Sequence, residues 1–169
     1  ENVVIEADGK NQWLDGIPMQ RDWQSMSVKE IIQAVRDGGV VGLGGAAFPA
    51  HVKLSPPSDR QIRALIVNAA ECEPYLTADH RCLLEQTDEF LTGVRIVMKA
   101  LGVNKCYIGI EVNKPDAVAL LKEKVDGKEI EVVELACKYP QGGEKNLIFA
   151  ITGIEIPSGG LPMDIGYVV

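Results

Sequence analysis

Three short runs of branched apolar residues alternate with helical patterns along this chain, and the alternation limits the folds that the chain can adopt. The runs are IRALIV at 62–67, KCYIGIE at 105–111 and IEVVEL at 130–135. Continuous apolar runs of this length are typical of strands that are buried on both faces of a parallel sheet. The sequence therefore predicts an α/β fold, an open and mostly parallel sheet with helices on both faces and right-handed crossovers.

Recognisable signals bound the helical segments. SVKE at 27–30 is a capping box, and Gly38-Gly39 is expected to end the helix that it begins. The pattern over 79–101 is also helical, with a break near Thr87. The Thr87 hydroxyl is expected to cap a second helix, which ends at Gly102.

The first 26 residues are set apart from the segment that follows. ENVVIEADGKNQW, at 1–13, reads as a strand and an Asp-Gly turn, and the first residue is not Met. We therefore expect a piece of a longer protein, in which 1–26 is a strand and linker and 27–169 is one domain. A length of 169 residues, 46% of them hydrophobic, suffices for one buried core.

The charge balance narrows the range of partners. The net charge is -7, and Lys and Arg form no cluster of the kind that binds nucleic-acid phosphates. No apolar run approaches the ~20 residues that cross a bilayer, and no basic-then-apolar leader opens the chain. The sequence therefore predicts a soluble segment that binds a small molecule or a protein, and no nucleic acid.

The four cysteines are too widely spaced for a short C-x-x-C metal or iron–sulfur motif, and they are expected to be free thiols. Cys106 and Cys137 fall in apolar, strand-like runs, where cysteine behaves as a small buried hydrophobe. His51 and His80 lack the spacing of a metal site or a catalytic triad and are expected to be surface or capping residues. We predict no metal site in this segment.

Polar residues follow two of the predicted strands, where ligands of open α/β sheets collect. Pro74 favours extended backbone at Glu73, so that Glu71 and Glu73 can face one pocket, although a solvated acidic loop is the alternative. We expect the two loops to converge on one cleft. Their polar and glycine residues are Asn68, Glu71 and Glu73 after the first run, and Tyr139, Gly142, Gly143, Glu144 and Lys145 after the third.

The segment GVVGLGGAAFPAHVKL, at 39–54, combines several glycines with one lysine. Gly42-x-Gly44-x-x-Ala47 loosely matches the dinucleotide fingerprint, in which bare backbone N–H groups cradle a phosphate. The match departs from the ordinary motif, because a helix and only two valines precede it. Lys53 could neutralise a phosphate held there. The alternative is a glycine-rich turn that lets elements pack closely, and this segment alone leaves both open.

Four stretches together resemble one family. GVVGLGGAAFPAHVKL, LIVNAAECEPYLTADHR, GIEVNKP and KYPQGGEKNLI…TG occur in the order and with the spacing of the NADH-oxidising RnfC subunit of the Rnf electron-transport complex. The chain is also similar, more distantly, to the flavin subunit of respiratory complex I and to related hydrogenase and formate dehydrogenase subunits. Ala70 stands where the complex I subunits have Asp, and Gly143 where they have Glu, and both departures favour the Rnf branch.

The resemblance implies a Rossmann-like domain that binds FMN non-covalently and admits NADH to the flavin. For FMN it implies Gly42, Gly44, Lys53, Asn68, Glu71, Tyr139, Gly142 and Gly143. For NADH it implies Gly45, Phe48, Glu73 and Glu144, with Phe48 as a stacking surface. No residue is assigned the role of acid or base, because the flavin carries the chemistry.

The resemblance also implies a place in a larger enzyme. RnfC oxidises NADH through FMN and passes electrons to two [4Fe–4S] clusters in an ion-translocating NAD:ferredoxin oxidoreductase. The whole protein is expected to carry a barrel-sandwich segment, of which 1–26 is a remnant, before this C-terminally truncated domain. A ubiquitin-like segment and the clusters are expected after it. Its place is then the cytoplasmic side of the plasma membrane, attached through the other Rnf subunits, with ferredoxin as an indirect partner.

Two other functions stay open. One is an NADH-dependent cobalamin reductase of the propanediol microcompartment, which carries a similar glycine segment. The other is a non-catalytic interaction domain that retains only the fold. Lys53, Asn68, Glu71 and Glu144 argue against the second, because a domain freed from nucleotide binding has no need of these polar loops.

Overall fold

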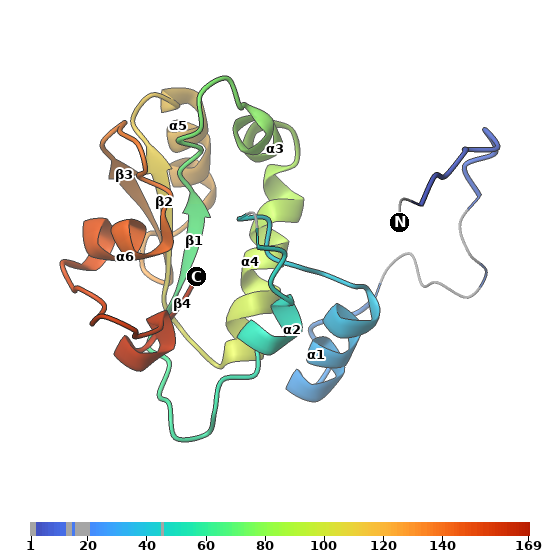
Figure 1. The fold of residues 1–169 in the computed structure, drawn as a ribbon, viewed down its shortest axis with the longest axis horizontal. Coiled ribbons are helices and arrows are strands. Elements are labelled where there is room, and N and C mark those ends of the chain that lie inside the picture. The colour runs from blue at the N-terminus through green and yellow to red at the C-terminus, as the bar shows by residue number, and fades with distance from the viewer. Residues whose placement is uncertain (1–2, 13–14, 16–20, 45) are drawn as a thin grey trace.

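A four-stranded parallel sheet, in the order β3-β2-β1-β4, forms the centre of the structure (Figure 1). The structure is a computed structural model and describes residues 3–12, 15, 21–44 and 46–169. The strands are β1 (Ala64–Ala69), β2 (Cys106–Glu111), β3 (Ile130–Leu135) and β4 (Tyr167–Val168). The predicted open parallel sheet is confirmed, and β4 adds an edge strand that the apolar runs do not predict.

Successive residues of each strand face opposite sides of the sheet. Leu65 of β1 and Ile108 of β2 pack with residues of the helices on one side, whereas Ile66 packs with α6 on the other. The helices on the first side are α3 (Ala78–Glu85), α4 (Thr87–Leu101) and α5 (Pro115–Lys124), and α6 (Glu144–Thr152) covers the second. The predicted placement of helices on both faces is therefore confirmed, and the crossovers α4 and α5 share one face.

An outer layer lies on α4. It consists of α1 (Val28–Asp37) and the short α2 (Ala50–Lys53). Ile31 of α1 and Leu54, which directly follows α2, are buried with Ala100 of α4. The predicted capping box is present, since Glu30 N–H donates to Ser27 Oγ and the Ser27 N–H donates to Glu30 Oε2. Hydrogen bonds from the side chain and backbone of Ser27 lower the pKa of Glu30. A 3₁₀ turn, η1 (Pro162–Ile165), precedes β4.

Glycine at position 109 lets α6 approach the sheet closely. A Cβ on Gly109 would lie 2.8 Å from Leu147 Cδ1, and 3.0 Å from both Ile151 Cδ1 and Leu135 Cδ1. Leu147 is fully buried, so it has little room to move away. The second hydrophobic layer therefore depends on a position without a side chain in the middle of β2.

Two local expectations are wrong. Residues 3–12 form no strand and are exposed, although a bend is present at Gly9, where Lys10 N–H donates to Asp8 Oδ1 at 2.9 Å. Among the described residues no neighbouring strand pairs with this segment, and a strand without a partner leaves its backbone groups to water. Thr87 does not cap α4, because its buried hydroxyl donates to the Leu83 carbonyl at 2.6 Å near the end of α3.

The cysteine expectation is correct at one position and wrong at the other. Cys106 lies within β2 and is fully buried, and this burial raises the pKa of its thiol to about 12. Cys137 is exposed, because β3 ends at Leu135 and the chain has entered the following loop. Among the described residues, no helix is long and apolar enough to span a bilayer.

Two glycine-to-alanine substitutions are expected to shift stability in opposite directions. Gly109→Ala should destabilise the domain by about 1–3 kcal/mol, because the added methyl group overpacks the contact with Leu147. Gly93→Ala, inside α4 with no described atom within 4 Å of the new Cβ, should stabilise it by about 1 kcal/mol through helix propensity. Urea unfolding followed by circular dichroism measures both. Equal effects of the two variants would contradict close packing of α6 at Gly109.

Candidate functional site

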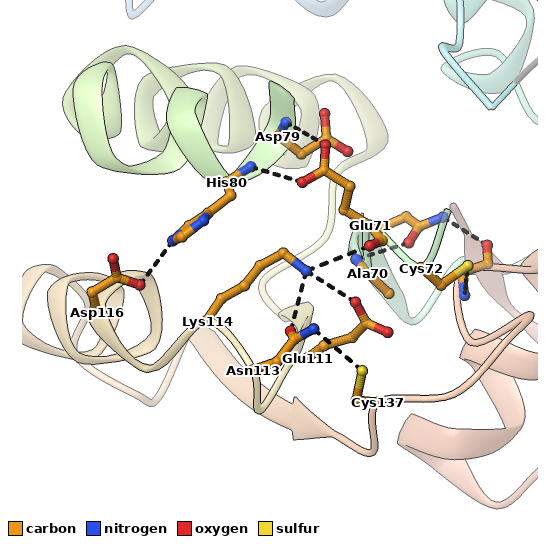
Figure 2. Close-up of polar contacts among 12 residues, drawn as sticks. Ala70, Glu71, Cys72, Asp79, His80, Glu111, Asn113, Lys114, Asp116 and Cys137 are labelled. Carbon is orange, nitrogen blue, oxygen red and sulfur yellow. Dashed lines mark hydrogen bonds and ion pairs between the residues drawn. The ribbon is translucent and has the colours of Figure 1, made fainter. Parts of the chain in front are cut away.

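A cleft of about 380 Å³ opens where β1, β2 and β3 end, and the loops after all three strands line it. Figure 2 shows the polar contacts along its wall. The parallel pairing brings the three carboxyl ends to one edge of the sheet, which is where ligands of such sheets bind. The volume lies in the range of small-molecule sites. Residues from each loop that carry chemistry are Glu71, Glu73, His80, Glu111, Lys114 and Tyr139.

Glu71 holds the N-terminus of α3 to the first loop. Its carboxylate accepts hydrogen bonds from the backbone N–H groups of Asp79 (2.9 Å) and His80 (3.3 Å), which have no partner within the helix (Figure 2). Partial burial, and then repulsion from Glu71, raises the pKa of Asp79. The alternative of a solvated acidic loop is therefore wrong for Glu71, because its carboxylate bonds to the backbone at the start of α3, beside the cleft.

Glu73 is the exposed carboxylate of this loop. It lines the same cleft as Glu71, as the sequence predicts, and lies where the chain turns through Tyr75. Among the described residues its carboxylate makes no hydrogen bond or ion pair. A carboxylate in this position remains available to a ligand.

Asn68 joins the first and third loops. Its Nδ2 donates to the Gly142 carbonyl at 2.8 Å, and its Oδ1 accepts from the Ala70 N–H at 3.2 Å. Gly142 N–H in turn donates to Cys72 Sγ at 3.4 Å. A Cβ on Gly142 would lie 2.5 Å from the Ala70 carbonyl, so only glycine fits there. The predicted convergence of these two loops is confirmed.

A buried ion pair connects the second loop to the other two. Glu111 Oε2 lies 2.9 Å from Lys114 Nζ, and the two residues are 1% and 6% exposed. Lys114 Nζ also donates to Asn113 Oδ1 (3.3 Å) and to the Glu71 carbonyl (3.5 Å). Asn113 Nδ2 donates to Cys137 Sγ at 3.2 Å in the third loop. These contacts fix the three loops relative to one another (Figure 2).

Sequence reasoning assigns no role to this second loop. The signal is present, because VNKP at 112–115 directly follows the apolar run KCYIGIE, and the carboxyl-end rule selects it as it selects the other two loops.

His80 links α3 to α5 at the side of the cleft. Its Nε2 lies 2.8 Å from Asp116 Oδ1, and a hydrogen bond from His80 is the main cause that lowers the pKa of Asp116. His51 lies in α2, half-buried. Among the described residues, no group of three or more His, Cys, Asp or Glu side chains is placed to hold a metal ion.

The glycine segment forms a separate feature. Val41 and Pro49 make an antiparallel bridge, and Gly42 N–H donates to the Phe48 carbonyl at 2.8 Å, which closes the loop. Lys53 Nζ donates to the Val169 carbonyl at 2.8 Å, beside β4. A Cβ on Gly42 would lie 3.3 Å from this ammonium group. The lysine that the sequence singles out is therefore next to the first glycine of the motif.

The predicted site residues fall into four places. Glu71, Glu73 and Tyr139 line the cleft, and Asn68 meets Gly142 at the junction of the first and third loops. Gly42, Gly44, Phe48 and Lys53 lie on the glycine segment, which is not among the cleft-lining residues. Gly143 and Glu144 begin α6. Gly45 lies outside the described residues.

The fold and the cleft define an α/β domain with a candidate ligand site at the carboxyl ends of its strands. Residues 35–169 match the model of the Nuo51 FMN-binding domain, and the chain belongs to this family. Over 75% of its length the chain also resembles the NAD+-reducing [NiFe]-hydrogenase in the air-oxidized state, with a TM-score of 0.65 and 28% identity, and it covers 24% of that chain.

Two bacterial relatives align with almost the whole of this sequence. The chain is 54% identical over 167 residues to the C subunit of the proton-translocating ferredoxin:NAD(+) oxidoreductase complex of Clostridium ljungdahlii. It is 47% identical over 169 residues to the C subunit of the Na(+)-translocating ferredoxin:NAD(+) oxidoreductase complex of Acetobacterium woodii. Both alignments cover 99% of this chain, and they cover 36% and 38% of the relatives. The predicted resemblance to RnfC is confirmed, and the chain spans little more than a third of these relatives.

Removal of the Asn68 side chain is expected to loosen the first and third loops together. Asn68→Ala should cost about 1 kcal/mol in stability and speed amide exchange in both 69–73 and 138–143, because one side chain bonds to both. Asn146→Ala is the matched control, since its bond to the Pro140 carbonyl (3.0 Å) stays within the third loop region. Hydrogen-exchange mass spectrometry compares the amide exchange rates of the two variants in 69–73 and 138–143. Unchanged exchange at 69–73 in Asn68→Ala would contradict the coupling.

Proposed function

We propose that this chain is the FMN- and NADH-binding domain of a subunit of an ion-translocating ferredoxin:NAD+ oxidoreductase complex of the Rnf type. In this function the subunit oxidises NADH through FMN and passes the electrons to iron–sulfur clusters that lie outside this segment. The observation that carries the proposal is the cleft formed by three strand ends in a chain of an FMN-binding family. The names of the relatives support this complex over a cobalamin reductase.

Three features of the structure fit FMN. The space beside Lys53 Nζ would be filled by a Cβ at Gly42, so glycine keeps the ammonium group accessible to a phosphate. Gly44 is exposed, with no described atom near the position of a Cβ, which lets a ligand approach the backbone. In the cleft, the buried Glu111 Oε1 has no hydrogen-bond partner among the described residues.

The chain's residues would hold and orient the two nucleotides. Gly42, Gly44 and Lys53 would bind the FMN phosphate. Asn68, Glu71, Tyr139, Gly142 and Gly143 would shape the flavin pocket, whereas Gly45, Phe48, Glu73 and Glu144 would face NADH. FMN, when bound, supplies the conversion of a hydride into single electrons. The protein's contribution is position, electrostatics and exclusion of water, and no side chain needs to transfer a proton.

The first test separates the two nucleotide sites in the natural protein that contains this chain. Wild-type protein should retain FMN by its absorbance, and NADH should reduce that flavin. Glu73→Gln should keep the full FMN content but slow the reduction by NADH, because this carboxylate is exposed and bonds to no described residue. Stopped-flow absorbance gives the rate. Loss of flavin during purification of Glu73→Gln would show that Glu73 belongs to the FMN site, and absence of FMN from wild type would overturn the proposed function.

The second test concerns Lys53. A protein of net charge -7 repels the FMN phosphate at long range, so local compensation must come from backbone N–H groups and this ammonium. A charge-assisted bond contributes about 1.5–3 kcal/mol, so Lys53→Ala should raise the FMN dissociation constant roughly 10- to 100-fold. The loss should shrink as salt rises. Lys53→Arg should recover only part, because a planar fork replaces a point charge.

Flavin fluorescence titration at low and high ionic strength measures these constants. Lys122→Ala is the matched control, because it removes one cation that pairs with Glu134 on the surface, away from the glycine segment. Its FMN affinity should stay that of wild type. If Lys53→Ala also binds FMN as tightly as wild type, the glycine segment holds the phosphate without the lysine.

A further inference from the structure

We propose that Glu111 Oε1 accepts a hydrogen bond from a neutral N–H or O–H group of the bound flavin or nicotinamide. This inference rests on the proposed function and adds a binding residue from the second loop, to which the sequence motifs assign no role. The shared chemistry is an uncharged donor, found in the flavin imide, the ribityl hydroxyls and the nicotinamide carboxamide.

The first observation is a buried acceptor without a partner at the wall of the cleft. Glu111 is 1% exposed and lines the cleft, yet its Oε1 makes no hydrogen bond to any described residue. Buried carboxylate oxygens are normally bonded, because an unsatisfied charged acceptor carries its full desolvation cost. Gln141 also has an unpartnered buried oxygen among the described residues, but it is not one of those that line the cleft. Glu111 is thus the position where a ligand can supply the missing donor.

The second observation is that Lys114 fully occupies the other side of Glu111. A lysine ammonium has three N–H donors, and those of Lys114 reach Glu111 Oε2, Asn113 Oδ1 and the Glu71 carbonyl (Figure 2). The pair therefore offers the cleft an acceptor, while its three donors are already taken. Because Lys114 already balances the charge of Glu111, the pair suits a neutral donor group. A phosphate brings only acceptors, so it is disfavoured here and suited to the glycine segment.

Replacement of Glu111 by Gln tests the direction of this bond. The Gln oxygen has to face the ammonium of Lys114, so its amide N–H₂ points to the place of the ligand donor, and two donors oppose each other. In the natural protein that contains this chain, Glu111→Gln should weaken binding of FMN or of NAD+ about 10- to 100-fold. Glu131→Gln is the control, because it also neutralises a lysine-paired Glu but lies outside the cleft lining.

A second variant keeps the test valid if Glu111→Gln unfolds. Glu111→Leu with Lys114→Met replaces the buried ion pair by apolar side chains, a change that is often neutral or stabilising. Urea unfolding confirms the fold of each variant. Fluorescence titration then uses FMN and N3-methyl-FMN, which lacks the imide donor. Competition titration uses NAD+ and its 3-acetylpyridine analogue, which lacks the carboxamide N–H₂.

The ligands identify the donor. If Glu111 binds the imide, N3-methylation weakens binding to wild type and has no further effect in the double variant. If it binds a ribityl hydroxyl, the double variant loses FMN affinity and the methylation penalty persists. If Glu111 binds the carboxamide, the 3-acetylpyridine analogue binds wild type more weakly than NAD+ does, and the two bind the double variant equally. FMN and N3-methyl-FMN then bind the double variant as they bind wild type. A folded double variant that binds all four ligands as wild type does would overturn the inference alone, whereas failure of wild type to bind FMN would overturn the proposed function with it.

Discussion

Parallel pairing of β1, β2 and β3 is the constraint on which the candidate site depends. Each strand of a parallel sheet needs a crossover to return the chain to the same end, so these three strands end at one edge and the helices that follow them start from it. The register aligns Asn68 with Gly109, and Glu111 with Leu135. Three loops far apart in the sequence thereby become neighbours, and single side chains such as Asn68 and Lys114 can bond across them.

Several acidic groups in and beside the cleft are bonded to other groups of the protein. Glu71 accepts the free N–H groups of α3, Glu111 pairs with Lys114, and Asp116 pairs with His80. Each of these carboxylates is thus held in place by bonds within the protein, and Glu111 is paired with a lysine ammonium group. Glu73 differs, because it is exposed and makes no such bond among the described residues, which fits a direct role toward a ligand.

The elements that could be predicted are those whose signals are local. The apolar runs place β1, β2 and β3, and the capping box places α1, because both depend on neighbouring residues. The errors at Thr87 and Cys137 have a different cause. The Thr87 hydroxyl bonds to the carbonyl of Leu83, four residues earlier in α3, and Cys137 is exposed because β3 ends before it. The predicted run at 130–135 matches β3 and already ends before Cys137, so the error was to count this cysteine with the strand.

The candidate site was predictable in its loops and not in its central contact. The rule that ligands bind at strand ends selects the loops of Glu71 and Tyr139 from sequence alone. The rule selects the second loop as well, but it does not single out the Glu111–Lys114 pair, since a Glu and a Lys three residues apart are ordinary on a protein surface. Its burial is what distinguishes the pair from a surface ion pair, and this burial results from the loops that pack over it. The β4 edge also lacks a signal, because a strand of two residues is too short to show a period.

The glycines show how packing and ligand approach can be told apart. Gly109 and Gly142 are explained by the protein itself, because a Cβ would meet Leu147 Cδ1 at 2.8 Å and the Ala70 carbonyl at 2.5 Å. Close packing thus accounts for Gly142 whether or not it touches FMN. Gly44 is different, since no described atom lies within 4 Å of its Cβ position. Of the two interpretations that the glycine segment leaves open, close packing among the described residues does not account for Gly44.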